Sequence, residues 1–102
     1  MSKRLLEATE RMVLRGNILQ ICEIARPLGA TEEVILCALR TEGYSCETED
    51  VRRECAYLQG KGLLTLEEIG NDALRVQRTL ASITPKGMDL LDGLIHEDGI
   101  QL

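Results

Sequence analysis

The sequence predicts a single α+β domain that is mainly α-helical, and three observations lead to this prediction. Apolar residues recur at helical spacing in three successive segments of the first 60 residues. Two segments of extended pattern follow, with Gly70, Asn71 and Asp72 as turn residues between them. Thr84 and Pro85 then form a strong start signal for a closing helix. The 102 residues suffice for one small domain, which we expect to span residues 1–102.

The first helix is expected to run from about Lys3 to Arg26 and to end before Pro27. Its apolar stripe changes side near Gly16 and Asn17, so either the helix breaks there or one long helix serves two surfaces. We favour the second interpretation, in which residues 1–15 form a helical extension. The later stripe consists of Leu14, Ile18, Ile21 and Ala25, and the earlier one of Leu5, Ala8, Met12 and Val13.

Two shorter helices are predicted next, each with a threonine at its start. Thr31 is expected to cap the second helix, which Gly43 ends. Thr48 is expected to cap the third helix, which Gly60 and Gly62 close. Val51, Cys55 and Leu58 form the inward stripe of this third helix.

The last third of the chain predicts a hairpin and a helix. The strands are expected at 63–67 and 74–83. The helix that starts at Thr84 carries Met88, Leu91 and Ile95 on its inward face. From Glu97 onward we expect a poorly ordered tail, within residues 96–102.

The composition argues against several classes of function. With a single histidine, His96, most histidine-dependent catalytic and metal sites are excluded, so we expect no enzyme, no catalytic residues, no cofactor and no metal. His96 is expected to be a solvated residue at a helix end, and a metal-ligand role with Asp89 or Asp92 is a remote alternative. The absence of Trp and Phe argues against a function in which aromatic side chains stack on single-stranded nucleic acid.

Four cysteines occur without any close pair, which argues against a zinc ribbon. Cys22, Cys37 and Cys55 fall on apolar helical positions and are expected to be reduced core residues. Cys46 lies in a polar link and is expected to be the exposed, oxidisable one. No apolar run approaches the roughly 20 residues needed to cross a bilayer, and charges fill the start of the chain. We therefore expect a cytoplasmic protein with no membrane partner.

The predicted order of elements is that of a winged helix-turn-helix domain: a three-helix core, a two-stranded wing and a C-terminal helix. The passage VRRECAYLQGKGLLTLEE resembles the recognition helix and first wing strand of winged-helix regulators, and ITPKGMDLLDGLI resembles the start of the helix after the wing. Together with EVILCALRTEGYSCETEDVRRECAYL, residues 10–100 resemble the small winged-helix proteins encoded in Mu-like phages and prophages. The resemblance implies that residues 48–60 enter a DNA major groove and that 67–75 form the wing.

The main functional hypothesis is therefore a dimeric DNA-binding protein, a transcriptional regulator of the phage type. The charge of the region is unfavourable, since residues 44–62 carry three basic and four acidic side chains. An alternative for Arg52 and Arg53 is that they are solvated or paired with Glu49 and Asp50. The candidate residues for contact with double-stranded DNA are Thr48, Arg52, Arg53, Tyr57, Gln59, Lys61, Arg75 and Arg78.

A homodimer is expected because the first and last helices carry more apolar residues than one small core requires. The candidate interface consists of Leu5, Ala8, Met12, Val13, Leu90 and Leu94. The alternative is a single, slightly overpacked core. Two other functions are alternatives: a protein–protein interaction module without DNA binding, which the net charge of −5 favours, and a redox sensor at Cys46.

Overall fold

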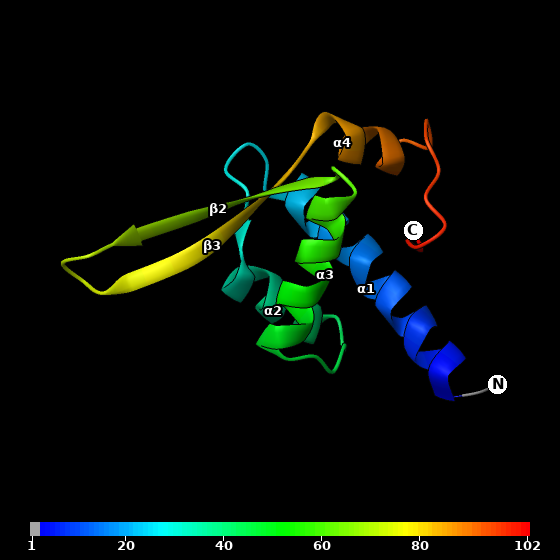
Figure 1. The fold of residues 1–102 in the computed structure, drawn as a ribbon, viewed down its shortest axis with the longest axis horizontal. Coiled ribbons are helices and arrows are strands. Elements are labelled where there is room, and N and C mark those ends of the chain that lie inside the picture. Colours follow the sequence, from blue (N-terminus) through cyan, green and yellow to red (C-terminus); the bar gives the residue numbers. More distant parts are fainter. Residues whose placement is uncertain (1–2) are drawn as a thin grey trace.

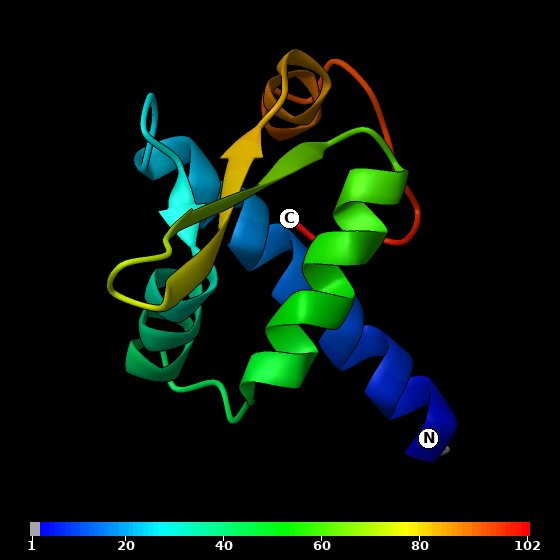
Figure 2. The ribbon, with the colours of Figure 1, turned by 60° about the vertical axis from the view of Figure 1, so that its left-hand side comes forward.

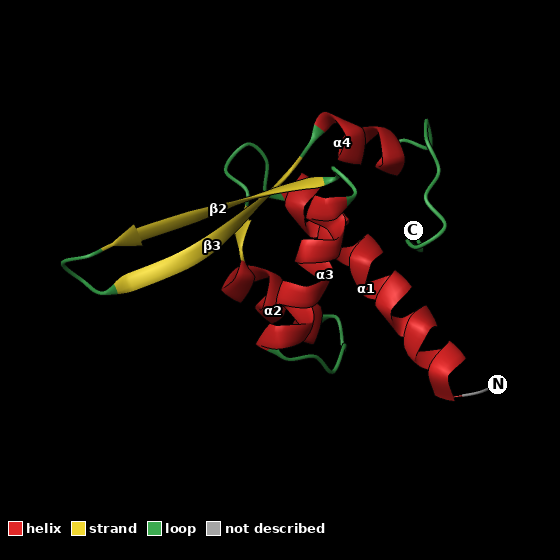
Figure 3. Ribbon diagram, in the orientation of Figure 1, coloured by secondary structure: helices red, strands yellow, loops and turns green. Residues whose placement is uncertain are grey.

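The structure, a computed structural model, describes the backbone of residues 3–102 and the side chains from residue 7 onward. Over that part of the chain it is an α+β fold, about half helical, with four helices and a three-stranded antiparallel sheet (Figures 1 and 3). The predicted α+β class is confirmed. The elements in chain order are α1 (Lys3–Ile24), β1 (Ala30–Thr31), α2 (Glu32–Thr41), α3 (Thr48–Gly60), β2 (Leu64–Asn71), β3 (Val76–Ile83) and α4 (Pro85–Leu91).

The first helix is continuous through Gly16 and Asn17, as the interpretation of one long helix predicted. Its second half packs in the core, where Ile18, Leu19 and Cys22 are fully buried. Its first half extends beyond the rest of the molecule (Figure 1). The helix ends two residues earlier than expected, at Ile24.

The sheet contains one strand that the sequence did not predict. The two residues of β1 pair antiparallel with β3, with Ala30 opposite Ala81, so the strand order is β1-β3-β2. The expected two-stranded hairpin is therefore part of a three-stranded sheet. A two-residue strand is too short to leave a recognisable alternation in the sequence.

The hairpin of β2 and β3 projects away from the helices (Figure 1), with β2 longer than predicted and β3 shorter. Its register runs from Leu64 opposite Ile83 to Asn71 opposite Val76, so the turn lies at 72–75 rather than at 70–72. Asn71 Oδ1 accepts a hydrogen bond from Leu74 N at 3.2 Å within this turn. Arg75, expected on the second strand, lies in the turn with a φ of 52°.

The helix starts follow short-range rules, with one correction. Thr31 Oγ1 accepts from Val34 N, and Thr84 Oγ1 accepts from Gly87 N, so both predicted caps are confirmed. The start of α3 differs: Thr48 is its first helical residue, and the cap is Glu47, whose N donates to Asp50 Oδ2 at 2.8 Å.

The C-terminal tail is packed against the body of the protein, so the expectation of poor order is wrong. Ile100 is buried, and Gln101 N donates to Met12 O at 3.0 Å. Arg15 Nη1 donates to Gly99 O at 2.9 Å. Because α4 ends at Leu91, the chain is free to turn back and run to α1 (Figure 2).

The cysteines divide differently from the expectation. Cys46 is buried and Cys37 is exposed, while Cys22 and Cys55 are buried as predicted. Arg40 Nε donates to Cys46 O at 3.1 Å, which ties the link between α2 and α3 to α2, and the Cys46 residue is 4% exposed.

Candidate nucleic-acid interface

Helix α3 has one buried face and one exposed face. Val51, Cys55 and Leu58 pack into the core, as predicted. The opposite face is open to solvent, and Figure 2 shows α3 on the near side of the molecule. A line of exposed residues with spacings of four, four and three runs along it and contains no carboxylate. We name these residues the α3 stripe: Thr48, Arg52, Ala56 and Gln59.

Arg52, in the centre of the α3 stripe, is hydrogen-bonded through one nitrogen and is otherwise largely exposed. Its Nε donates to Glu32 Oε2 at 2.9 Å. The Glu32 side chain is 7% exposed, whereas that of Arg52 is 65% exposed. Within the described part of the chain Arg52 makes no second hydrogen bond, so its two Nη groups face solvent.

The start of α2 also pairs with a second candidate residue, Arg78. Arg78, on β3, lies 3.7 Å from Glu33 through its Nε and a carboxylate oxygen. Glu32 and Glu33 are the first two residues of α2, where the helix dipole stabilises their charge. The first turn of α2 therefore supplies one carboxylate to Arg52 and another to Arg78. Arg78 pairs with α2 and not with the carboxylates of its own hairpin, where Glu68 accepts from Thr79 Oγ1.

Arg53 lies on the other side of α3 and is more fully engaged. Its Nε donates to Glu54 Oε2 at 3.0 Å, and its Nη2 donates to Asp50 Oδ1 at 3.1 Å. The expected alternative of pairing with Asp50 is thus confirmed for Arg53. The hydrogen bond that Arg53 donates to Glu54 is the largest cause that raises the pKa of Arg53.

Glu54 is a fully buried carboxylate that sequence reasoning missed. Besides Arg53, it accepts hydrogen bonds from Arg11 Nε at 3.0 Å and Arg15 Nε at 2.9 Å, both on α1. Burial alone would raise the pKa of Glu54, but the hydrogen bonds from Arg15, Arg53 and Arg11 outweigh it, so the net shift is downward. The available signal was weak: two arginines four residues apart on the first helix, where they share a face.

Tyr57 and Lys61 face the C-terminal tail rather than the α3 stripe. The Arg15 guanidinium lies 3.5 Å from the centroid of the Tyr57 ring. Lys61 Nζ lies 3.6 Å from Glu97 Oε2, in the tail. These two candidate DNA contacts are therefore grouped with α1 and the tail, and the structure does not bring them to Arg52.

The last candidate DNA contact, Arg75, stands at the end of the hairpin. It is exposed and makes no ion pair with any side chain that the structure describes. Glu67, Glu68 and Asp72 are exposed on the same hairpin, so the wing as a whole is not basic. Three carboxylates against two arginines give this hairpin no electrostatic attraction for phosphate.

The candidate dimer residues differ in their exposure to solvent. Leu90 is 2% exposed and belongs to the core of its own chain, so its assignment to an interface is wrong. Helix α4 is short, and its buried face includes Leu90, so the core of the same chain uses this apolar residue. Leu94 is 73% exposed and Ala8 is exposed, whereas Met12 and Val13 are partly buried. The side chain of Leu5 lies outside the described residues.

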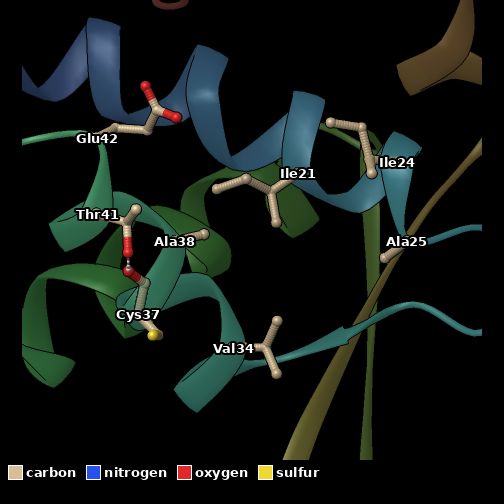
Figure 4. Close-up of a pocket in the computed structure, with 8 residues that line it drawn as sticks. All are labelled: Ile21, Ile24, Ala25, Val34, Cys37, Ala38, Thr41 and Glu42. Carbon is tan, nitrogen blue, oxygen red and sulfur yellow. Dashed lines mark hydrogen bonds between the residues drawn. The ribbon is translucent and has the colours of Figure 1, made fainter.

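An apolar groove between α1 and α2 is a surface that the sequence did not reveal. It has a volume of about 530 Å³, and Ile21, Ile24, Val34 and Cys37 are among the residues that line it (Figure 4). Ile24 is 83% exposed at its edge. Glu42 is the one charged residue in the lining that the structure describes.

No group of three or more His, Cys, Asp or Glu side chains among the described residues is arranged to hold a metal ion. His96 Nε2 lies 2.7 Å from Asp98 Oδ1, and both side chains are exposed. No helix in the described part of the chain combines the length and the apolar character needed to cross a membrane. Comparison of the sequence with known protein families and with curated proteins finds no match.

Proposed function

We propose that this chain is a winged-helix domain that binds double-stranded DNA through α3, as a transcriptional regulator of the type encoded by Mu-like phages. The order of elements α1-β1-α2-α3-β2-β3-α4 is compatible with that fold. The resemblance of residues 51–68 and 83–95 to winged-helix regulators supports the same proposal. The protein would act in the cytoplasm, where its DNA is found.

The single observation that carries the proposal is the α3 stripe. Arg52 and Gln59 supply side chains that hydrogen-bond to base edges, and Thr48 supplies a hydroxyl for a base or phosphate. Ala56 lies between them and is small, so the helix can approach the floor of a major groove closely. The 13 residues of α3 span roughly 20 Å at 1.5 Å per residue, which exceeds the roughly 12 Å width of that groove.

The electrostatics of the site predict an unusual kind of DNA binding. Arg52, Arg53 and Arg78 are each paired with at least one carboxylate, so few unmatched cations are available to phosphates. Phosphate contacts release counterions and produce a slope of about −0.9 per contact in a plot of log K against log salt. With roughly two such contacts, we expect a slope of about −2 and weak non-specific binding.

Fluorescence anisotropy tests this proposal. The purified protein is titrated into labelled duplexes tiled from its own genomic neighbourhood, at several salt concentrations. We expect one or few tiles to bind, and Arg52→Ala to weaken that binding by roughly 10-fold or more. Arg26→Ala, which also removes one exposed cation but lies at the end of α1, is the matched control and should change the affinity less than about twofold. Absence of binding to every tile at low salt would exclude the proposal.

A second candidate function is self-association through the α1–α2 groove, and one observation favours it. The protein carries a net charge of −5, so two copies repel each other unless they meet through a face of low charge. The groove has Glu42 as the one charged residue in its described lining, and it offers both a protruding side chain, Ile24, and a hollow beside it. A two-fold interface requires such a self-complementary surface. We infer that the occupant is a second copy of this chain.

Sedimentation equilibrium distinguishes this interface from the one around the last helix. We expect the native protein to be a dimer and Ile24→Glu to be a monomer. In the variant each copy would bring one buried carboxylate to the shared contact, and the two would repel each other. Leu94→Glu introduces the same charge at another exposed leucine and should leave the dimer intact. A monomeric native protein, or a dimer that only Leu94→Glu dissociates, would exclude the groove as the interface.

A further inference from the structure

We propose that Arg52 reads a guanine through its terminal Nη1 and Nη2 groups, and that Glu32 is the positioning residue that makes this end-on contact possible. This inference rests on the proposed DNA binding and extends it to a base and to a second residue. It follows from how the two side chains meet, from their contrasting burial and from their combined charge.

The hydrogen bond to Glu32 uses one particular edge of the guanidinium group. Glu32 Oε2 accepts from Nε at 2.9 Å, so the side edge of Arg52 that contains Nε is occupied. The end edge, with one N–H from each Nη, remains available. In the major groove, guanine presents two acceptors side by side, O6 and N7, whereas adenine presents one acceptor beside a donor. Two parallel donors therefore match guanine and meet a donor on adenine.

Burial at one end of the pair fixes the orientation of the free end. Glu32 is nearly enclosed by the protein and sits in the first turn of α2, so its carboxylate has little freedom to move. Arg52, although largely exposed, is tied to that carboxylate. A side chain held in this way loses less conformational freedom when it binds than a free arginine does.

The charge of the pair favours a base over a phosphate. Arg52 and Glu32 together are neutral, and the carboxylate beside the guanidinium repels an approaching phosphate. A base edge carries no net charge and keeps its two hydrogen bonds. The geometry therefore assigns Arg52 to base readout rather than to the DNA backbone.

Arg53 provides an internal contrast. Two carboxylates hold it, Glu54 through Nε and Asp50 through Nη2, and its side chain is 48% exposed against 65% for Arg52. Two carboxylates beside one guanidinium leave Arg53 more restrained than Arg52 and repel an approaching DNA strand more strongly. We therefore expect the guanine preference to depend on Arg52 and to survive Arg53→Ala.

The first experiment identifies the base. Duplexes are selected from a random library with the full-length protein, and the enriched sequence is then synthesised with 7-deazaguanine, which lacks the N7 acceptor, at each guanine in turn. We expect one position at which this change weakens binding of the native protein by roughly 10-fold. The same change should have less than a twofold effect on Arg52→Ala, because the contact is already absent there.

The second experiment tests the positioning role of Glu32. Glu32→Gln keeps the shape of the side chain but removes its charge, so Arg52 becomes an unmatched cation that is held more weakly. We expect the preference for guanine over adenine at that position to fall from roughly 10-fold or more to less than about threefold, while the salt slope steepens by about 0.9. Glu33→Gln, in the adjacent residue, is the matched control and should keep the preference. Thermal melting of each variant verifies that the fold is intact. A smaller folded fraction would lower the affinities for both bases alike and would leave their ratio unchanged.

The outcomes separate the two proposals. If no duplex sequence is enriched over the input library, both the DNA-binding function and the role of Arg52 are excluded. If a sequence is enriched but no guanine in it depends on Arg52, or if Glu32→Gln keeps the full preference, DNA binding stands and this inference is overturned.

Discussion

The four thiols of this protein differ chiefly in their access to solvent. Burial raises the pKa of Cys22 and of Cys55 to about 12, because the thiolate cannot be solvated in the core. Burial, followed by the charge of Asp50, also raises the pKa of Cys46. Cys37 is the exposed one, at the edge of the α1–α2 groove. A redox role for Cys46 would require a thiol that is both exposed and readily ionised. The Cys46 side chain is instead buried, and its pKa is raised.

We expect one thiol of the folded protein to react quickly with a chromogenic disulfide reagent, and all four after denaturation. The fast reaction should disappear in Cys37→Ser, since only that thiolate is open to attack. Cys46→Ser is the control and should keep it. A fast phase that is lost in Cys46→Ser would contradict the buried position of that side chain.

Two helix caps of the same residue type allow a comparison of local energies. Thr31 Oγ1 makes one hydrogen bond, accepting from Val34 N at 3.3 Å. Thr84 Oγ1 makes two, accepting from Gly87 N and donating to Gly62 O at 2.6 Å, which ties the start of α4 to the end of the α3–β2 link.

Thr84→Ala should therefore destabilise the protein by about 2 kcal/mol, and Thr31→Ala by about 1 kcal/mol or less. Urea denaturation followed by circular dichroism measures both. Thr84→Ser keeps the hydroxyl and should stay close to the native protein. Equal losses for the two alanine variants would show that the bond to Gly62 contributes nothing.

At the level of elements, the main feature is the clasp between α1 and the C-terminal tail. The backbone of Gln101 bonds to Met12 O, and Arg15 bonds to Gly99 O. Gly16 makes room for this arrangement, since a Cβ there would collide with the carbonyl oxygen of Gln101. The glycine that looked like a possible break in the helix therefore serves a close approach of two backbones.

Substitution of this glycine should release the tail. Gly16→Ala improves the helix propensity of α1 by about 1 kcal/mol, but the tail must move, and its bonds to Met12 and Arg15 are lost. We expect residues 97–102 to become sensitive to carboxypeptidase. Gly60→Ala in α3 has open space around its Cβ and should instead stabilise the protein by about 0.5–1 kcal/mol without exposing the tail. A protected tail in Gly16→Ala would contradict the clasp.

For the whole molecule, the buried Glu54 joins the long first helix to α3 through hydrogen bonds from Arg11 and Arg15. Three guanidinium groups converge on one carboxylate, and two of them belong to α1. The pKa of Glu54 is lower in the folded protein than its ordinary value of 4.5. The folded state therefore binds this proton less readily than the unfolded chain does. This contribution to stability is complete above about pH 4.5 and is lost as the pH falls below it.

We expect Glu54→Gln to cost about 3–5 kcal/mol at pH 7, because three arginines lose their buried counter-ion. Its unfolding free energy should also fall less steeply between pH 5 and 3, a window chosen around the ordinary carboxyl pKa of 4.5, than that of the native protein. Denaturation at a series of pH values checks both statements. Parallel pH profiles for the two proteins would show that Glu54 does not account for the acid sensitivity.

The sequence by itself determined the parts that depend on near neighbours. The caps at Thr31 and Thr84, the glycine ending of α2 at Gly43 and the inward face of α3 each follow from residues within one or two turns. The exposed side of α3 follows as its complement, so Thr48, Arg52 and Gln59 were predictable members of the candidate site. Periodicity and capping are local effects, and they leave a local mark in the sequence.

The tertiary structure alone decided how charges and chain ends meet. Arg11 and Glu54 are 43 residues apart in sequence, and Arg15 and Gly99 are 84 apart, yet each pair is joined by a hydrogen bond. A charge count over residues 44–62 includes Glu54 but not the arginines of α1. In the folded protein, Arg11 and Arg15 of α1 neutralise the charge of Glu54. The partner of Arg52, the burial of Leu90 and the pairing of β1 with β3 also depend on residues far apart in sequence, so the sequence did not predict them. Contacts of this kind depend on how elements pack, and packing is not periodic along the chain.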